Sequence, residues 1–179
     1  MNRTAPSIRN KLSALKYHAL GSRFGQTKSC NTPGCDCCNT ISKQAEHMVN
    51  GVKVRTAPGT CESYNIVYLA ECAICSMFYV GRTTSALRTR CNGHRSKYYE
   101  ILRNKDLDLS KDDYSLGLHI HQVHNSVNRA DFNKLYKFSI LENCNPSKLE
   151  VQEHKWIHRL NTLIPKGINT MNPFGIPIF

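Results

Sequence analysis

Long apolar runs are missing from this sequence of 179 residues. No stretch approaches the roughly 18 consecutive apolar residues that a membrane-spanning helix requires, so we expect no membrane partner. The first residues form no apolar signal core, which predicts an intracellular rather than a secreted protein. Internal repeats are absent as well. What is left is a chain long enough for one good core with a small appendage.

Acidic residues are scarce. The chain has 24 Lys and Arg against 13 Asp and Glu, for a formal net charge of +11. Residues 1–60 hold nine basic and two acidic residues, whereas residues 61–179 hold fifteen and eleven. A basic excess can serve solubility alone, but one this large favours a polyanionic partner held through phosphate contacts. We therefore expect a nucleic acid, DNA or RNA, as the partner.

Cysteine, in contrast, is abundant, with nine residues. The odd count and the missing signal core disfavour a secreted disulfide framework. Two C-x-x-C pairs occur, Cys35 with Cys38 and Cys72 with Cys75. In a reducing compartment this spacing is more typical of zinc than of a disulfide.

Composition divides the chain into three parts. Residues 1–28 are basic with weak periodicity, which predicts a loosely ordered arm. Residues 29–61 are rich in cysteine but poor in large apolar residues, so this linker is expected to need a metal for stability. Residues 62–179 have the texture of a folded domain.

Within the domain, apolar runs at Asn65–Cys72 and Met77–Gly81 predict a hairpin. A helix capped by Thr84 or Ser85 is expected to follow and to end near Leu102. Residues 104–115 are polar and predict a loop, and residues 119–124 a short helix. Residues 135–141 alternate and predict a third strand, with Tyr136, Phe138 and Ile140 on one face and Lys137 and Ser139 on the other. Asn145-Pro146 should open a final helix that runs to about Asn161, and residues 165–179 should form an irregular strap.

Two helices carry polar side chains of chemical interest. Arg90 and His94 lie four residues apart, hence on one helical face, and a guanidinium beside an imidazole suits a phosphate. Glu153 shares the apolar face of the final helix with Leu149 and Ile157, where a carboxylate is costly without a cation or donors. A solvated basic face and a carboxylate paired with Lys or Arg are the plain alternatives.

Six short motifs occur in one order: Ile66-Val67-Tyr68, Tyr79-Val80-Gly81, Leu87-x-x-Arg90, His94, Glu153-x-x-Trp156-Ile157 and Gly167-Ile168-Asn169. This series resembles the GIY-YIG endonuclease superfamily, with Ile66 standing where the family name has glycine. The chain is most similar to the endonuclease domain of Penelope-like retroelements. Those domains also place a C-x-x-C between the two tyrosine motifs and a Cys-rich segment upstream. The resemblance covers about residues 30–175.

The resemblance implies an α/β (α+β) fold of the GIY-YIG type, in which helices flank a three-stranded antiparallel sheet, with the Cys-rich zinc-binding segment before it. It implies Mg²⁺- or Mn²⁺-dependent hydrolysis of DNA phosphodiesters, in the nucleus if the host is eukaryotic. Tyr68 and Tyr79 would flank the scissile phosphate, and Tyr68 would help to deprotonate or position the attacking water. We expect cationic surroundings to lower the tyrosine pKa for that purpose.

The remaining implied roles belong to four residues. Arg90 would stabilise charge on the phosphoryl oxygens, and Glu153 would hold a single Mg²⁺. His94 would act in acid–base chemistry or position the phosphate, and Asn169 would brace the site. Because the chain has no reverse-transcriptase core, work for a mobile element would need a reverse transcriptase in cis or in trans.

Two structural zinc sites are expected, and their pairing stays open. The first set is Cys72, Cys75, His119 and His124, where the two histidines fit the H-x₃₋₅-H spacing and His121 competes with His119. The second set is Cys30, Cys35, Cys38 and Cys61, with Cys37 as the alternative to Cys35. Cys91 and Cys144 are expected to pack in the core.

Two other classes of protein compete with the nuclease. One is a zinc-containing module that binds DNA or RNA without cutting it, which the basic first third favours. The other is a redox or disulfide protein built on C-x-x-C. The sequence leaves the oligomeric state and the preferred DNA site open.

Overall fold

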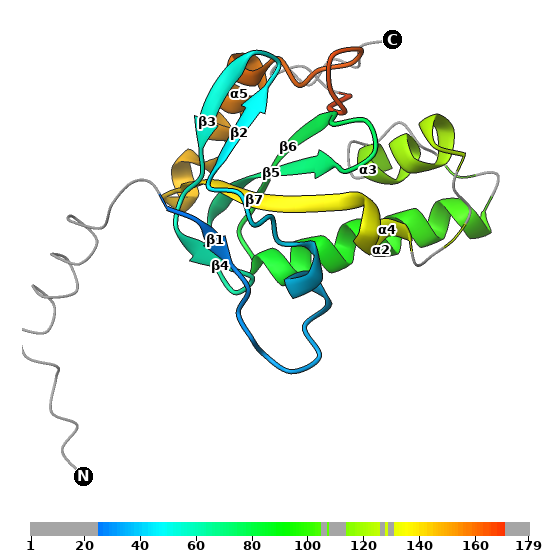
Figure 1. Cartoon of the computed structure of the whole chain (residues 1–179), viewed down its shortest axis with the longest axis horizontal. Coiled ribbons are helices and arrows are strands. Elements are labelled where there is room, and N and C mark those ends of the chain that lie inside the picture. The colour runs from blue at the N-terminus through cyan, green and yellow to red at the C-terminus, as the bar shows by residue number, and fades with distance from the viewer. Residues whose placement is uncertain (1–24, 105–106, 108–113, 126–127, 129–130, 171–179) are drawn as a thin grey trace, which may run out of the picture.

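A three-stranded antiparallel sheet forms the centre of the molecule (Figure 1). In this computed structural model the described residues are 25–104, 107, 114–125, 128 and 131–170. The strands are β5 (Ile66–Cys72), β6 (Phe78–Thr83) and β7 (Tyr136–Asn143), in the order β6-β5-β7. β5 is buried along almost its whole length, because a strand pairs with each of its edges and a core covers each of its faces.

Each face of the sheet has its own core. Helix α2 (Leu87–Arg103) packs on the face that carries Tyr68, Phe138 and Ile140. Helix α5 (Leu149–Leu160) packs on the opposite face. The alternation along β5 explains the division, since consecutive side chains of a strand point to opposite faces. Short helices complete the structure: η1 (Asp36–Thr40), α3 (Ser115–Leu118), the π-helix η3 (His119–Val123), α4 (Asp131–Leu135) and η4 (Pro146–Lys148).

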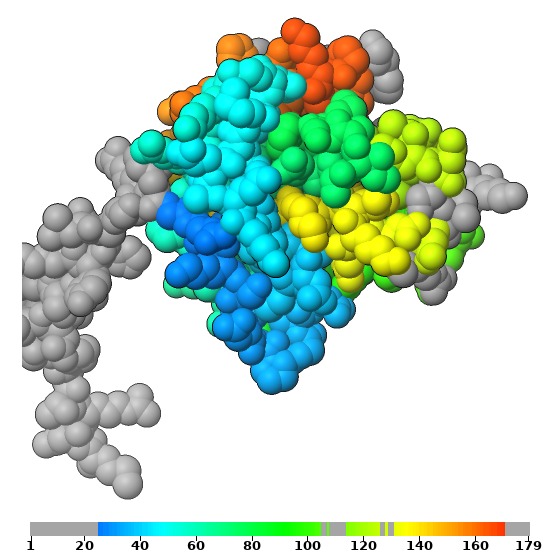
Figure 2. All heavy atoms as spheres, viewed as in Figure 1, coloured from blue at the N-terminus to red at the C-terminus, as the bar shows by residue number. Residues whose placement is uncertain are grey.

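The Cys-rich segment lies along the outer edge of β7. It contains the hairpin of β2 (Glu46–Val49) and β3 (Val52–Arg55), and β4 (Gly59–Thr60), which pairs in parallel with β1 (Thr27–Lys28). Backbone N–H groups of Ser42 and Ala57 donate to the carbonyls of Phe138 and Ile140 over 2.9 and 2.7 Å. Figure 2 shows this segment, in blue to cyan, against the yellow of β7. An exposed strand edge is thereby protected from pairing with other chains.

The mixed α+β class is confirmed, and so are its main elements. The hairpin and the third strand lie within about two residues of their expected bounds, and the expected final helix is present as the turn η4 followed by α5. The expected cap of α2 is wrong: its N-cap is Ala86, with no side-chain bond. Instead, Leu87 and Arg88 donate their N–H groups to the carbonyls of Ser63 and Cys61 over 2.9 and 2.8 Å. A neighbouring loop thus satisfies the first helical donors, which no local sequence signal reveals.

Other expectations are only partly covered by the described residues. Residues 1–24 of the expected arm and 171–179 of the expected strap lie outside them, as do most of residues 104–115. The expected linker has more core than its composition suggested, because Val49 and Val54 are buried against the α5 face. The helix expected at residues 119–124 is present as η3.

A buried polar chain fixes the β2–β3 hairpin to the sheet. His47 of β2 lies with its Nε2 2.9 Å from the Ser139 hydroxyl and its Nδ1 3.2 Å from the Glu71 carboxylate. The order carboxylate, imidazole, hydroxyl is that of a hydrolytic triad. However, the Ser139 side chain is buried, so a substrate has no access to it. The Glu71–His47–Ser139 contacts are therefore structural: they join the β2–β3 hairpin to the sheet.

Replacing His47 with alanine should lower the free energy of unfolding by about 2–3 kcal/mol, because it leaves the buried Ser139 hydroxyl unpaired and opens a cavity. Urea denaturation measures the loss. The neighbouring Met48, with 62% of its surface exposed, is the control, since Met48→Ala should change stability by less than about 0.5 kcal/mol. Equal effects of the two substitutions would contradict this structural role.

Candidate active site and metal centres

Three polar side chains meet beneath β5. Tyr68 is fully buried, and its hydroxyl lies 2.6 Å from Nε2 of His94. Arg90 donates its Nε–H to the same hydroxyl over 3.0 Å. Both partners come from α2, one turn apart on the face that covers β5, as their spacing in the sequence predicted.

Tyr79 and Gly81 of β6 complete this side of the site. The Tyr79 ring lies 6.3 Å from the Tyr68 ring and 5.7 Å from His94, edge to face with the imidazole. Gly81 pairs with Tyr68 across the ladder, and a Cβ at Gly81 would overlap the Tyr68 hydroxyl. Glycine is therefore needed at this position so that the phenol can lie across the strand.

The expected lowering of the tyrosine pKa is wrong for Tyr68. Burial raises the pKa of Tyr68 far above its usual value, and the neighbouring Arg90 opposes this effect only in part. The negative charge of Glu153 acts in the same direction as burial. The Tyr68 hydroxyl is consequently protonated at neutral pH and is a hydrogen-bond donor rather than a base.

Glu153 extends from α5 to the edge strand β6. Its side chain is only 14% exposed, and its carboxylate lies 2.9 Å from Nε of Arg82. Arg82 also lies 3.5 Å from the carboxylate of the exposed Glu150. Arg82 is thus one cation that compensates the Glu153 carboxylate. Sequence reasoning missed this residue, although it directly follows Gly81 in the second tyrosine motif.

Asn169 binds the backbone of β6 rather than the interior of the site. Its side chain accepts from the N–H of Val80 over 3.0 Å and donates to the carbonyl of Val80 over 2.8 Å. Thr162 donates its hydroxyl to the same amide oxygen over 2.7 Å. Asn169 thus fixes β6 at Val80, next to Tyr79, as the expected bracing role requires.

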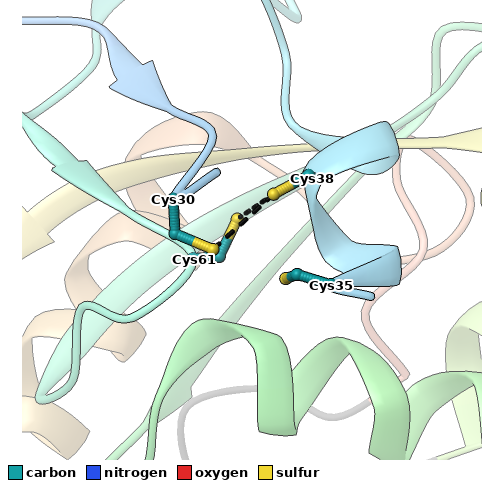
Figure 3. Close-up of side chains that lie close together, drawn as sticks. All are labelled: Cys30, Cys35, Cys38 and Cys61. Carbon is teal, nitrogen blue, oxygen red and sulfur yellow. Dashed lines mark hydrogen bonds between the residues drawn. The ribbon is translucent and has the colours of Figure 1, made fainter. Parts of the chain in front are cut away.

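The four cysteines of one expected zinc set lie together. Cys30, Cys35, Cys38 and Cys61 come from separate segments, and their side chains converge (Figure 3). The Cys38 sulfur lies 3.6 Å from that of Cys30 and 3.7 Å from that of Cys61. Tetrahedral zinc with bonds of about 2.3 Å separates its sulfur ligands by about 3.8 Å. The cluster can therefore bind a metal such as zinc.

The second expected set also converges. The sulfur of Cys72 lies 3.3 Å from Nε2 of His124, and that of Cys75 lies 3.3 Å from Nε2 of His119. The two histidine nitrogens are 3.2 Å apart. These spacings again suit tetrahedral zinc. Burial, together with the neighbouring His124, lowers the pKa of His119 to about 4, so this imidazole is neutral at pH 7, as a metal ligand must be.

The structure decides between the alternative ligands. Cys37 lies with its sulfur 3.3 Å from that of Cys91, buried between η1 and α2, and is no member of the four-cysteine cluster. His121 likewise stands outside the Cys₂His₂ cluster. Cys91 packs in the core as expected, whereas Cys144 is only partly buried.

Comparison with other proteins adds no relative. No helix among the described residues is long and apolar enough to cross a membrane. The chain matches no protein-family model, no curated protein and no solved structure.

Proposed function

We propose that this protein is a metal-dependent endonuclease with a GIY-YIG-type fold, most similar to those of Penelope-like retroelements, that nicks or cuts target DNA. The observation that carries the proposal is the contact network of Tyr68, His94 and Arg90, next to Tyr79, with Glu153 paired to Arg82 on the strand that carries Tyr79. These residue types suit phosphodiester hydrolysis, because they supply a cation and proton donors to a phosphoryl group. We include in the same proposal that it cuts this DNA for a mobile element, in the nucleus if the host is eukaryotic.

In the proposed reaction a water oxygen bonds to phosphorus while a sugar oxygen leaves. Arg90 stabilises the charge that develops on the phosphoryl oxygens. Tyr68, which is fully buried, stays protonated and orients the guanidinium of Arg90, whose Nε–H it accepts. The attacking water loses its proton to solvent and the leaving sugar oxygen gains one from solvent, while His94 holds the Tyr68 hydroxyl through their hydrogen bond. Gly81 leaves room for the Tyr68 phenol in this position.

Glu153 is the residue that would hold Mg²⁺ or Mn²⁺, which would neutralise phosphate charge as a Lewis acid. A single carboxylate fits Mg²⁺, which keeps several of its waters. Arg82 now pairs with that carboxylate and would have to release it. The second partner of Arg82 is Glu150, whose side chain is 63% exposed. Arg82 could therefore keep its contact with Glu150 after it has left Glu153. The donor set therefore fits the ion once the Arg82–Glu153 pair opens.

Nicking of supercoiled plasmid tests the proposal. We expect the wild type to relax the plasmid when Mg²⁺ is added, and Glu153→Gln to lose at least about a hundredfold in rate, because the amide is a poor ligand for the cation. Glu150→Gln is the matched control, one turn earlier on the same helix and bound to the same arginine. Equal rates for all three proteins would reject the assignment.

The second candidate is a zinc-containing module that binds nucleic acid without cutting it. The burial of Tyr68 and the Arg82–Glu153 pair favour it, since both keep the site closed. A module of this kind should bind DNA with an affinity that falls as salt is added. The bound DNA should stay intact with Mg²⁺, with Mn²⁺ and without either ion.

A further inference from the structure

Helix α5 has an outer side that the proposed active site does not use. Its apolar side packs on the sheet through Leu149, Ile157 and Leu160. Its two acidic residues both contact Arg82. On the remaining side, exposed cations recur at spacings of seven and four residues, which places them in one line along the helix. These residues, called the α5 basic stripe below, are Lys148, Lys155 and Arg159.

The stripe differs in its pairing from three cations of α2. Arg88, Arg95 and Lys97 on α2 all form ion pairs with carboxylates. Among the ion pairs between described residues, none involves a residue of the stripe. Arg159 lies over the Trp156 ring at 4.9 Å, a contact that leaves its charge uncompensated. The charge of the stripe is therefore open to an external anion.

Helix stability explains only Arg159, which lies in the last turn of α5, where a positive charge is favourable. Lys155 and Arg159 are like charges four residues apart, an arrangement that costs an isolated helix about 0.2–0.5 kcal/mol. Lys148 lies at the N-terminal end of α5, where a positive charge opposes the helix dipole. A stripe chosen only for solubility would mix both signs, as β3 does with its partner Glu46. The unfavourable arrangement points to a bound partner that compensates it.

We propose that the α5 basic stripe binds the phosphate backbone of duplex DNA, as a contact surface separate from the active site. Eleven residues of helix span about 16 Å, which matches roughly five base pairs at about 3.4 Å each. Glu153 points to the opposite side of α5, toward β6. The stripe therefore contacts DNA at phosphates other than the one that is hydrolysed. The proposal shares its partner with the proposed function but does not depend on hydrolysis.

The test compares two triple variants with equal loss of charge. Lys148→Gln/Lys155→Gln/Arg159→Gln removes the stripe, and Lys53→Gln/Arg55→Gln/Lys134→Gln removes exposed cations elsewhere. Binding of a labelled 30-base-pair duplex is measured by fluorescence anisotropy between 50 and 200 mM NaCl, without Mg²⁺. Because each phosphate contact contributes about 0.9 to the slope of log K against log salt, the stripe variant should lose about 2.7 from that slope. The control should lose less than about 1.

The outcomes separate this inference from the proposed function. A smaller slope for the stripe variant alone supports the stripe, whether or not the wild type nicks plasmid. Equal slopes for the two variants overturn it, even if nicking is observed. Loss of binding to anionic phosphatidylserine vesicles with unchanged DNA binding also overturns it. Circular dichroism confirms that both variants are folded, since all six positions are exposed.

Discussion

Replacing Arg90 with alanine is expected to slow plasmid nicking by about 10²–10³-fold. Arg90 supplies the guanidinium nearest to the Tyr68 hydroxyl, to which it donates over 3.0 Å. Loss of one donor that stabilises developing phosphoryl charge costs enzymes a factor of this size. Arg90→Lys should recover only part of the rate, because an ammonium lacks the planar fork that binds two oxygens at once.

Arg88 is the matched control. It lies on the same helix two residues earlier, is 45% exposed and pairs with Glu62 at 3.4 Å, away from the tyrosines. We expect Arg88→Ala to nick at nearly the wild-type rate. Nicking is followed under single-turnover conditions with saturating protein, so that weaker DNA binding does not mimic slower chemistry. If Arg88→Ala and Arg90→Ala lost rate equally, the charge of α2 rather than the Tyr68 network would be responsible.

Removal of metal is the second large effect. We expect two zinc ions per chain by elemental analysis, one for each cluster. Structural zinc contributes an apparent binding free energy of about 10–16 kcal/mol, which is comparable to the whole stability of a domain. A strong chelator should therefore abolish cooperative thermal unfolding and DNA binding together, and added Zn²⁺ should restore both.

Single substitutions assign the two ions. Cys61→Ser and Cys75→Ser should each reduce the content to one zinc, because each removes a ligand from a different cluster. Cys144→Ser should retain two, since Cys144 belongs to neither. In the wild-type protein, titration of thiols after chelation should find all nine cysteines free. Disulfide-bonded thiols and no zinc would instead identify the redox protein that C-x-x-C spacing also permits.

The fold was predictable where local signals were strong. Alternation and β-forming residues identified the hairpin of β5 and β6, and Asn145-Pro146 identified the start of the last helix. The eight zinc-ligand candidates were identified from spacing, since chelating residues close in sequence form half of each cluster. Bringing the halves together required the tertiary fold.

The choice between Cys35 and Cys37 illustrates the limit. The two cysteines are two residues apart, and spacing cannot separate them. η1 turns Cys35 toward Cys38 and Cys61, whereas Cys37 points into the core toward Cys91. Conformation over five residues, set by packing against α2, makes the decision.

By itself, the sequence determined the α+β class, the positions of the main strands and helices, the candidate metal ligands and the basic character of the chain. These properties depend on periodicity, spacing and composition, which are local. Only the tertiary structure decided that burial raises the pKa of Tyr68, that Arg82 pairs with Glu153 and that backbone carbonyls cap α2. Desolvation and ion pairing depend on which segments meet in space, and residues far apart in the chain supply those contacts.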